Sequence, residues 1–600
     1  MTVVGKVFES SATSIIVKME FENFEKNKDN LKIGKHLKIS VGNHDCLIST
    51  IKNIRAISDG SSENDKYLLT TDPVGIISDG VFTPGSSILP SPTEEVEVAD
   101  KKVLEKIFLK NDKYSYKLGE VTQNKDISLF LDGNKFFGKH IGIVGSTGSG
   151  KSCTVAKIIQ EAVGIKGKQN KHIGEQKNSH VIIFDIHSEY EAAFTLEEKQ
   201  KFSLNLLEVG NLKLPYWLMN SEELESLFIE SNELNSHNQV SQFRKAVILN
   251  KEKYNSGLDN VTYDTPVYFS IKEVYTFIKN VNNEMINKVA DTPKLPKIIS
   301  EVGENPYIDD INRYFEKEFE FVPSSNAGAT KATSGPYHGD FNRFISRLEN
   351  KINDNRLKFI IDPKNEDGSE IMTNDFEEIL KQFLGYIDQS NISIIDLSGI
   401  PFEVLSIIVS LISRIIFDFA FHYSKLKNSI GEKNDVPFLI VCEEAHNYIP
   451  RDNSAYYKAS KKSLERIAKE GRKYGLSLMV VSQRPSEVSD TIFSQCNNFI
   501  SLRLTNISDQ SYIKNLLPNN TNSIADILPT LASGECLVVG DAVPIATVAK
   551  MSLPDPKPHS EDIEVYDVWN ENWKKLTGDE DEKERSISIS IENVLERWRN

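Results

Sequence analysis

Cysteine is scarce in this chain, with five residues among 600. The five lie far apart and form neither a C-x-x-C pair nor a cysteine–histidine cluster with metal-ligand spacing. This pattern argues against a disulfide framework and a zinc site, and it predicts reduced thiols in a cytoplasmic protein. The cysteines are Cys46, Cys153, Cys442, Cys496 and Cys536.

Long hydrophobic runs and targeting signals are also missing. Residues Met1 to Lys6 do not form a basic segment followed by an apolar one, so we expect no secretory signal. The most apolar stretch, Val404 to Tyr423, contains Arg414 and Asp418. Because charged side chains are costly inside a bilayer, this stretch is predicted to be a buried helix rather than a membrane span.

The chain has no excess of positive charge: its formal net charge is −16 at pH 7. Such a balance argues against a protein that coats nucleic acid with its whole surface, but it leaves room for a local basic channel. A chain of 600 residues is too long for one hydrophobic core, so several domains are expected.

What the chain does contain is a glycine-rich turn between an apolar strand and an amphipathic helix. The strand is Ile141 to Val144, and apolar residues recur at helical spacing in 155–162. The turn has the P-loop form G-x-x-x-x-G-K-S. Glycine lets the backbone turn tightly and point N–H groups at a phosphate, and the helix dipole adds positive potential.

Phosphate binding therefore follows from the turn, although a chance glycine-rich turn is the alternative. The strand before it, the helix after it and the complete pattern favour a nucleotide site. Lys151 would reach the β- and γ-phosphates, and the Ser152 hydroxyl would hold Mg²⁺. ATP and Mg²⁺ are thus the predicted ligands. The residues expected to bind the nucleotide are Gly145, Ser146, Thr147, Gly148, Ser149, Gly150, Lys151, Ser152 and Cys153.

A second apolar strand, Phe438 to Cys442, ends in the paired carboxylates of Glu443 and Glu444. This is the Walker B pattern. Glu443 would hold Mg²⁺ through water, and Glu444 would polarise the attacking water, a task that needs a carboxylate near the γ-phosphate. The alternative is that both acids merely cap the next helix.

Polar residues also follow the apolar strand Val181 to Asp185. Its end delivers Asp185, His187, Glu189 and Tyr190 to the edge where ligands bind in open parallel sheets. Asp185 could equally cap the next turn, and His187 could be a structural residue. The spacing matches no known metal site, so both interpretations stay open.

A basic helix covers 461–473 and leads into the strand Leu476 to Gln483. Such a run is usually a solvated face, but it could also line a channel for nucleic acid. Gln483, at the strand end, can sense the γ-phosphate. An arginine from a neighbouring subunit can neutralise transition-state charge, and Arg472 is the first candidate for it, with Arg466 second.

The pattern of elements divides the chain into five segments. Residues 1–98 have short β-branched runs and turn residues, which predict a small barrel or sandwich for docking or assembly. Residues 99–194 and 388–552 are the halves of one α/β core. Residues 195–387 are charged and mostly helix-patterned, which indicates a helical insertion. Residues 553–600 form an extended arm.

Taken together, these motifs resemble the HerA-type ATPases, relatives of the FtsK DNA pumps in the ring-forming RecA-like group. The order of segments is also that of the family. Ile186 and Ser188 differ from the usual Pro and Gly, and Glu443 replaces the commoner Asp. The matching motifs are Gly145-Ser-Thr-Gly-Ser-Gly-Lys-Ser152, Asp185-Ile-His-Ser-Glu-Tyr190, Asp396-Leu-Ser-Gly399, Glu443-Glu-Ala-His446, Glu470-Gly-Arg-Lys-Tyr-Gly475 and Ser482-Gln-Arg-Pro485.

The resemblance implies a RecA-like core, a homohexameric ring and ATP sites between subunits. It implies that Glu444 is the catalytic carboxylate, that Arg472 acts in trans and that Gln483 is the sensor. It also implies a motor that passes double-stranded DNA through its pore. Family members work with an effector, either a nuclease in end resection or a sirtuin-like NAD hydrolase in anti-phage defence. The effector would dock on the N-terminal β-domain.

Three functions are therefore in competition. The first is an ATP-driven DNA translocase (a helicase-type motor) that serves an effector. The second is a scaffold whose ring assembles and activates the effector without processive transport. The third is a P-loop enzyme acting on a small substrate, such as a kinase, which Glu443 and Glu444 disfavour because paired carboxylates suit water activation.

Overall fold

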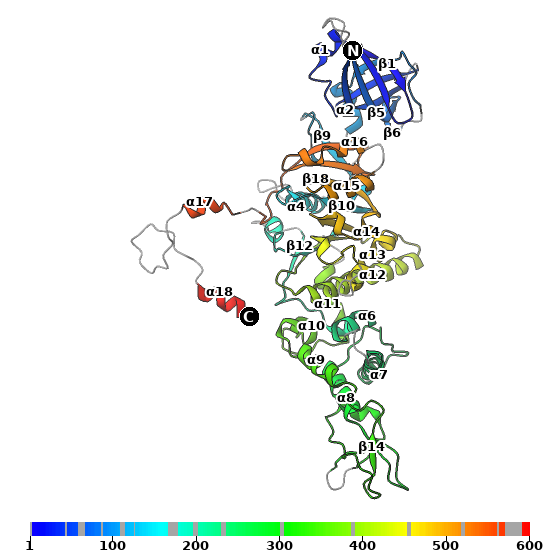
Figure 1. Ribbon diagram of the computed structural model, residues 1–600, viewed down its shortest axis with the longest axis vertical. Coiled ribbons are helices and arrows are strands. Elements are labelled where there is room, and N and C mark those ends of the chain that lie inside the picture. Colours follow the sequence, from blue (N-terminus) through cyan, green and yellow to red (C-terminus); the bar gives the residue numbers. More distant parts are fainter. Residues whose placement is uncertain are drawn as a thin grey trace, which may run out of the picture. The chain divides into compact units, whose positions relative to one another are not determined.

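The computed structural model describes residues 3–599 except for 43–44, 58–65, 86–87, 109–114, 125, 166–177, 196–201, 230–235, 301–304, 386–390, 453–457, 518–521, 561–562 and 571–590. It divides into two compact units, Met1–Pro558 and His559–Asn600. The first unit holds a β-barrel, a mixed sheet flanked by helices, and a largely helical insertion (Figure 1).

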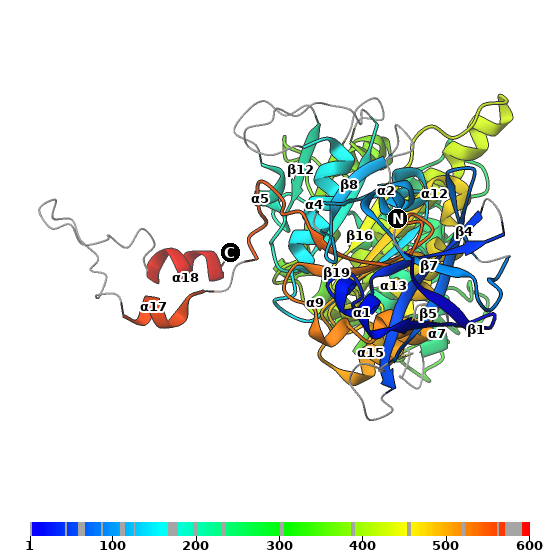
Figure 2. The same ribbon diagram turned by 90° about the horizontal axis from the view of Figure 1, so that it is seen from above.

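The N-terminal strands close into a barrel (Figure 2). Their order is β2-β1-β7-β3-β4-β5-β6, and a further β2–β5 pairing closes the ring, with β6 attached to β5. Val17, Leu37 and Leu47 fill the interior. The β-domain expected from the sequence is thus a barrel. Its strands are β1 (Val3–Ser10), β2 (Ile15–Glu20), β3 (His36–Val41), β4 (Asp45–Ile57), β5 (Lys66–Ser78), β6 (Val81–Pro84) and β7 (Glu95–Val98).

The centre of the first unit is an 11-stranded sheet of order β12-β15-β11-β16-β17-β10-β18-β19-β20-β8-β9. Neighbours from β12 to β18 are parallel. The strand β17 lies between the P-loop strand β10 and the carboxylate-bearing strand β16. The parallel strands are β10 (His140–Val144), β11 (His180–Asp185), β12 (Ser203–Leu207), β15 (Asn391–Asp396), β16 (Phe438–Cys442), β17 (Leu476–Ser482) and β18 (Cys496–Leu502).

Both faces of the parallel strands are buried, which explains their continuous apolar sequences. Along β11, Ile182 and Phe184 join the core beneath α12 (Phe402–Ser429) and the insertion. Val181 and Ile183 join the opposite core, which contains α4 (Lys151–Val163). Because side chains alternate along a strand, one apolar run serves both layers.

The sheet continues beyond β18 as an antiparallel extension. β19 (Glu535–Gly540) pairs with β18, β20 (Thr547–Met551) follows, and β8 (Ser115–Val121) and β9 (Ser128–Asp132) complete the edge. Residues within the predicted first half of the core thus supply two edge strands. β8 and β9 form a local hairpin, whereas the pairing of β8 with β20 joins segments far apart in the chain and is not visible in the local sequence.

Between β12 and β15 the chain builds the insertion. One core strand, β12, therefore lies within residues 195–387, the segment predicted to be the insertion; the boundaries of the five segments stay a prediction. A short antiparallel pair, β13 (Met285–Asn287) and β14 (Ala332–Ser334), also interrupts the helices. The helices are α6 (Ser221–Phe228), α7 (Ser236–Tyr254), α8 (Ile271–Asn283), α9 (Asn342–Ile352), α10 (Lys358–Ile361) and α11 (Phe376–Leu384).

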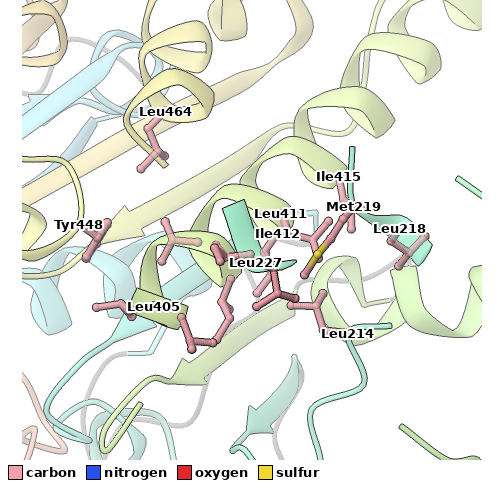
Figure 3. Packing of buried hydrophobic residues seen from close by; sticks show 14 of the residues in the cluster. Leu214, Leu218, Met219, Leu227, Leu405, Leu411, Ile412, Ile415, Tyr448 and Leu464 are labelled. Atoms are coloured by element: carbon pink, nitrogen blue, oxygen red, sulfur yellow. The ribbon is translucent and has the colours of Figure 1, made fainter. Parts of the chain in front are cut away.

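The long helix α12 joins the insertion to the sheet. Figure 3 shows its residues Leu405, Leu411 and Ile412 packed close to Leu227 of α6 and Tyr448, in one buried cluster. From Val404 to Ser429 the helix is long and apolar enough to cross a membrane, but 78% of its most apolar window is buried in the protein. The predicted buried helix is confirmed.

The second unit holds two helices among its described residues, α17 (Val565–Trp569) and α18 (Ile591–Arg599). Trp569 and Trp598 are exposed within it. The unit covers most of the arm predicted for residues 553–600, whereas 571–590 lie outside the described residues.

Candidate active site

The P-loop joins the end of β10 to the start of α4 as the sequence predicts. Gly148 and Gly150 have φ values of 70° and 99°, in the left-handed region that favours glycine. Ser146 N–H donates to the Arg503 carbonyl at 2.8 Å, and Gly534 N–H donates to the Ser149 carbonyl at 3.0 Å. The loop is thus held from outside, which leaves the α4 N-terminus free to receive an anion.

The first glycine of the loop is required by packing. A Cβ at Gly145 would lie 2.6 Å from Ser149 Oγ and 2.8 Å from Leu502 Cβ. We expect Gly145→Ala to weaken ATP binding about tenfold or more, because extra atoms in a packed site cost about 1–3 kcal/mol. Titration with a fluorescent ATP analogue measures this effect. Gly210→Ala is the matched control, because nothing lies within 4 Å of its added Cβ, and equal affinity of both variants would contradict the packing argument.

Glu444 stands beside the P-loop lysine. It follows β16, is 5% exposed and has a φ of 42°. Its Oε1 lies 3.8 Å from Lys151 Nζ, and its Oε2 accepts from the backbone N–H of Gln483 at 3.3 Å. The strand order explains why Gln483 contacts Glu444 beside the P-loop. β17 lies between β10 and β16, so the residue that follows it, Gln483, lies between the P-loop and Glu444.

Glu443 lies in a buried acidic environment. It is 2% exposed, and its Oε1 accepts from Tyr190 Oη at 3.0 Å. Its Oε2 is buried without a hydrogen-bond partner among the described residues. Burial and the charges of Asp185, Glu189 and Glu444 raise the pKa of Glu443 well above its usual value. An unpartnered buried carboxylate oxygen fits a role in holding a cation such as Mg²⁺, whose charge would reverse that shift.

The turn after β11 is held by Asp185. Its carboxylate accepts from the N–H groups of His187 at 3.2 Å and Tyr190 at 2.9 Å. This is the capping role that the sequence left open, and burial raises the pKa of Asp185. Ser188, with a φ of 56°, donates to Asp396 at 2.5 Å. The turn therefore positions Tyr190 against Glu443 and connects β11 to β15.

Gln483 contacts the P-loop directly. Thr147 Oγ1 donates to Gln483 Oε1 at 2.6 Å, so the side chain predicted to be the sensor lies at the phosphate loop. Ser146 Oγ lies 3.1 Å from Thr505 Oγ1, and Ser533 Oγ donates to the Gly148 carbonyl at 3.2 Å. Sequence reasoning missed Thr505 and Ser533, because nothing in the sequence marks short polar residues that reach the P-loop from the segments after β18 and before β19.

Arg472 lies at the end of the parallel strands that is opposite the P-loop. It is exposed in the turn before β17, and its Nη1 donates to Asn497 Oδ1 at 3.4 Å, near the start of β18. β10, β17 and β18 are parallel, so their starts lie opposite the P-loop. Arg472 therefore cannot complete the site of its own chain. Arg466, the second candidate, lies 3.9 Å from Asp418 and stacks over Phe417.

Most of the described positive charges on the basic helix α13 (Lys458–Glu470) have acidic or carbonyl partners within the chain. Its described cations contact acids or carbonyl groups, most of them on neighbouring elements, so it is a mostly paired, solvated face. The contacts are Lys461 with the Arg451 and Asp452 carbonyls, Lys462 with Glu222, Arg466 with Asp418, and Lys469 with Glu465.

Comparison with known proteins identifies the family. The family model "Helicase HerA, central domain" matches residues 116–416. The DNA double-strand break repair helicase HerA of Sulfolobus acidocaldarius is 27% identical over 492 residues, covering 82% of this chain and 79% of that protein. A probable DNA double-strand break repair helicase HerA of Methanocaldococcus jannaschii is 23% identical over 598 residues, covering 95% and 98%.

Among solved structures, the bacterial conjugative coupling protein TrwB aligns with a TM-score of 0.42 and 11% identity, covering 77% of this chain and 94% of that one. The family match covers half of the chain and contains the P-loop and the turn after β11, while the matches to the two HerA proteins extend over most of it. The chain belongs to the HerA family of P-loop ATPases.

Proposed function

We propose that this protein hydrolyses ATP at a site shared between subunits and uses that hydrolysis to move along or through double-stranded DNA. The observation that carries the proposal is the approach of Glu444 to Lys151 at the P-loop of a HerA-family core. Motion on DNA is supported by the family and by relatives that carry the name of repair helicases.

Different residues of the chain would bind the phosphates and the metal ion. Lys151 and the backbone N–H groups of 145–153 hold the phosphates, and the dipole of α4 favours their negative charge. Ser152 and Glu443 would hold Mg²⁺, which neutralises charge on the β- and γ-phosphates when bound. Gln483, already bonded to Thr147, is placed to register whether a γ-phosphate is present.

Glu444 acts on the water. Binding of ATP draws Lys151 to the phosphates and frees Glu444 Oε1, which lies 3.8 Å from that lysine. The carboxylate then orients a water for attack on the γ-phosphorus, and the bond to the β-phosphate oxygen breaks to give ADP and phosphate. This chemistry needs no second substrate, so it favours an ATPase over a small-molecule kinase.

The position of Arg472 supports an oligomer. The arginine lies opposite its own P-loop, so it can serve catalysis only at a neighbour's site. A closed ring repeats such a head-to-tail interface for every subunit, and a hexamer is the form that the resemblance implies.

Duplex DNA should stimulate this ATPase. We expect turnover to rise on addition of double-stranded DNA at low salt and the stimulation to fade as salt increases, because phosphate contacts weaken with ionic strength. Phosphate release with and without duplex DNA, over a series of salt concentrations, measures this. Because the cations of α13 are mostly paired, the prediction does not rest on that helix.

An ATPase that hydrolyses ATP normally but ignores duplex DNA at every salt concentration would contradict a motor. That result would favour the scaffold, in which ATP controls assembly of an effector complex. The effector, a nuclease or a sirtuin-like NAD hydrolase, would dock on the N-terminal barrel. Docking is tested by co-purifying either effector with the full chain and with a chain that lacks residues 2–98. Equal capture of the effector by both chains would exclude the barrel as the docking site.

A further inference from the structure

His446 lies directly against the carboxylate of Glu444. It belongs to the short 3₁₀ turn η6 (Ala445–Asn447), and its side chain is 11% exposed. Its Nδ1 atom is 3.3 Å from Glu444 Oε2 and 3.3 Å from Ser482 Oγ. Neither the Walker B strand nor the P-loop requires a histidine there, so its function is not explained by nucleotide binding.

The two oxygens of Glu444 have different surroundings. Oε2 faces His446 Nδ1 and the N–H of Gln483, both at 3.3 Å, whereas Oε1 faces Lys151. We propose that His446 is a positioning residue that, with Gln483 N–H, holds Oε2 and leaves Oε1 to orient the attacking water. The proposal rests on the ATPase activity and does not depend on DNA translocation.

The hydrogen-bond network supports a proton on Nδ1. Ser482 Oγ accepts from the N–H of Arg484 at 3.0 Å and is close to His446 Nδ1. Nδ1 thus faces two oxygen atoms, a hydroxyl and a carboxylate, and a lone pair there would repel the carboxylate. Burial lowers the pKa of His446 against the opposing effect of Glu444, so a neutral ring with one N–H fits the site.

The backbone of Glu444 makes such support necessary. A φ of 42° is uncommon for a residue with a side chain and persists only where its surroundings fix it. η6 follows immediately, and Tyr448 Oη donates to the Glu443 carbonyl at 3.0 Å. His446 therefore connects the strained corner at Glu444 to the end of β17 through Ser482.

The test compares three replacements of His446 in the full chain. His446→Ala removes the donor, His446→Asn keeps one near the Nδ1 position, and His446→Gln places one nearer the Nε2 position. We expect His446→Ala to lower kcat for basal ATP hydrolysis by on the order of 10²-fold, because small misplacements of a catalytic group have such effects. ATP affinity should stay within about twofold, a change of less than half a kcal/mol, and His446→Asn should recover much of the rate while His446→Gln should not.

His422→Ala, at an exposed histidine of α12, is the matched control and should hydrolyse ATP like the unmodified chain. Unchanged kcat in His446→Ala would overturn the proposal. So would a loss of ATP binding or of thermal stability that His446→Asn fails to recover, because that result assigns a structural role. Basal hydrolysis is measured without DNA, so a failed DNA response leaves this test unaffected.

Discussion

Glu444→Gln is expected to bind ATP with nearly unchanged affinity and to lower kcat by about 10²–10⁴-fold, the range of a lost general base. The amide keeps the size of the side chain and one hydrogen-bonding oxygen, but it cannot polarise water as a carboxylate does. Lys151 also loses its ionic partner at 3.8 Å, so the phosphate-binding lysine should be at least as available as before.

Two measurements separate binding from chemistry in this variant. Equilibrium titration with an ATP analogue gives affinity, and single-turnover hydrolysis gives the rate of the chemical step. Glu432→Gln is the control, because Glu432 is exposed, pairs with Lys427 and precedes the start of β16, the strand end opposite Glu444. A Glu444→Gln variant with normal turnover would remove Glu444 from catalysis, and a loss of affinity equal to the loss of rate would assign it to binding.

Arg472→Ala is expected to lower kcat by about 10³–10⁵-fold, the contribution of an arginine that stabilises transition-state charge. The loss should occur although, among the described residues, the one hydrogen bond of the Arg472 side chain is long, to Asn497 at 3.4 Å. The stability of the subunit should therefore change little. Steady-state phosphate release and thermal unfolding measure both expectations.

Lys469→Ala is the matched control, because Lys469 lies on the preceding helix, is exposed and pairs with Glu465 at 3.8 Å. It should hydrolyse ATP like the unmodified chain. A normal rate in Arg472→Ala would show that the transition state needs no arginine from this turn. Arg466→Ala would then be the next variant to measure, although the stacking of Arg466 on Phe417 favours a structural role for this arginine.

The sequence predicted the parts of the site that have strict local patterns. Gly145 to Ser152 is a contiguous motif, and Glu444 follows a continuous apolar strand, so both were visible without a structure. The approach of Gln483 to Thr147 was less visible, because it depends on β17 lying between β10 and β16. Order in a sheet is a property of tertiary packing and not of local sequence.

The sequence was weaker where polar residues act across large separations. Thr505 and Ser533 contact the P-loop from hundreds of residues away, and each is an ordinary polar residue in its own segment. The partners of the basic helix were hidden for the same reason. Its lysines and arginines are clustered in sequence, but their acidic partners, such as Glu222 and Asp418, come from α6 and α12.

The central claim is that each ATP site takes its phosphate loop from one subunit and its arginine from another. Co-expression of Lys151→Ala and Arg472→Ala chains, each inactive alone, followed by purification of mixed oligomers, tests it most directly. A site is competent when an Arg472→Ala chain binds ATP and a Lys151→Ala neighbour donates Arg472, so random mixing should restore about a quarter of full activity. Mixed oligomers no more active than either parent would contradict the shared site.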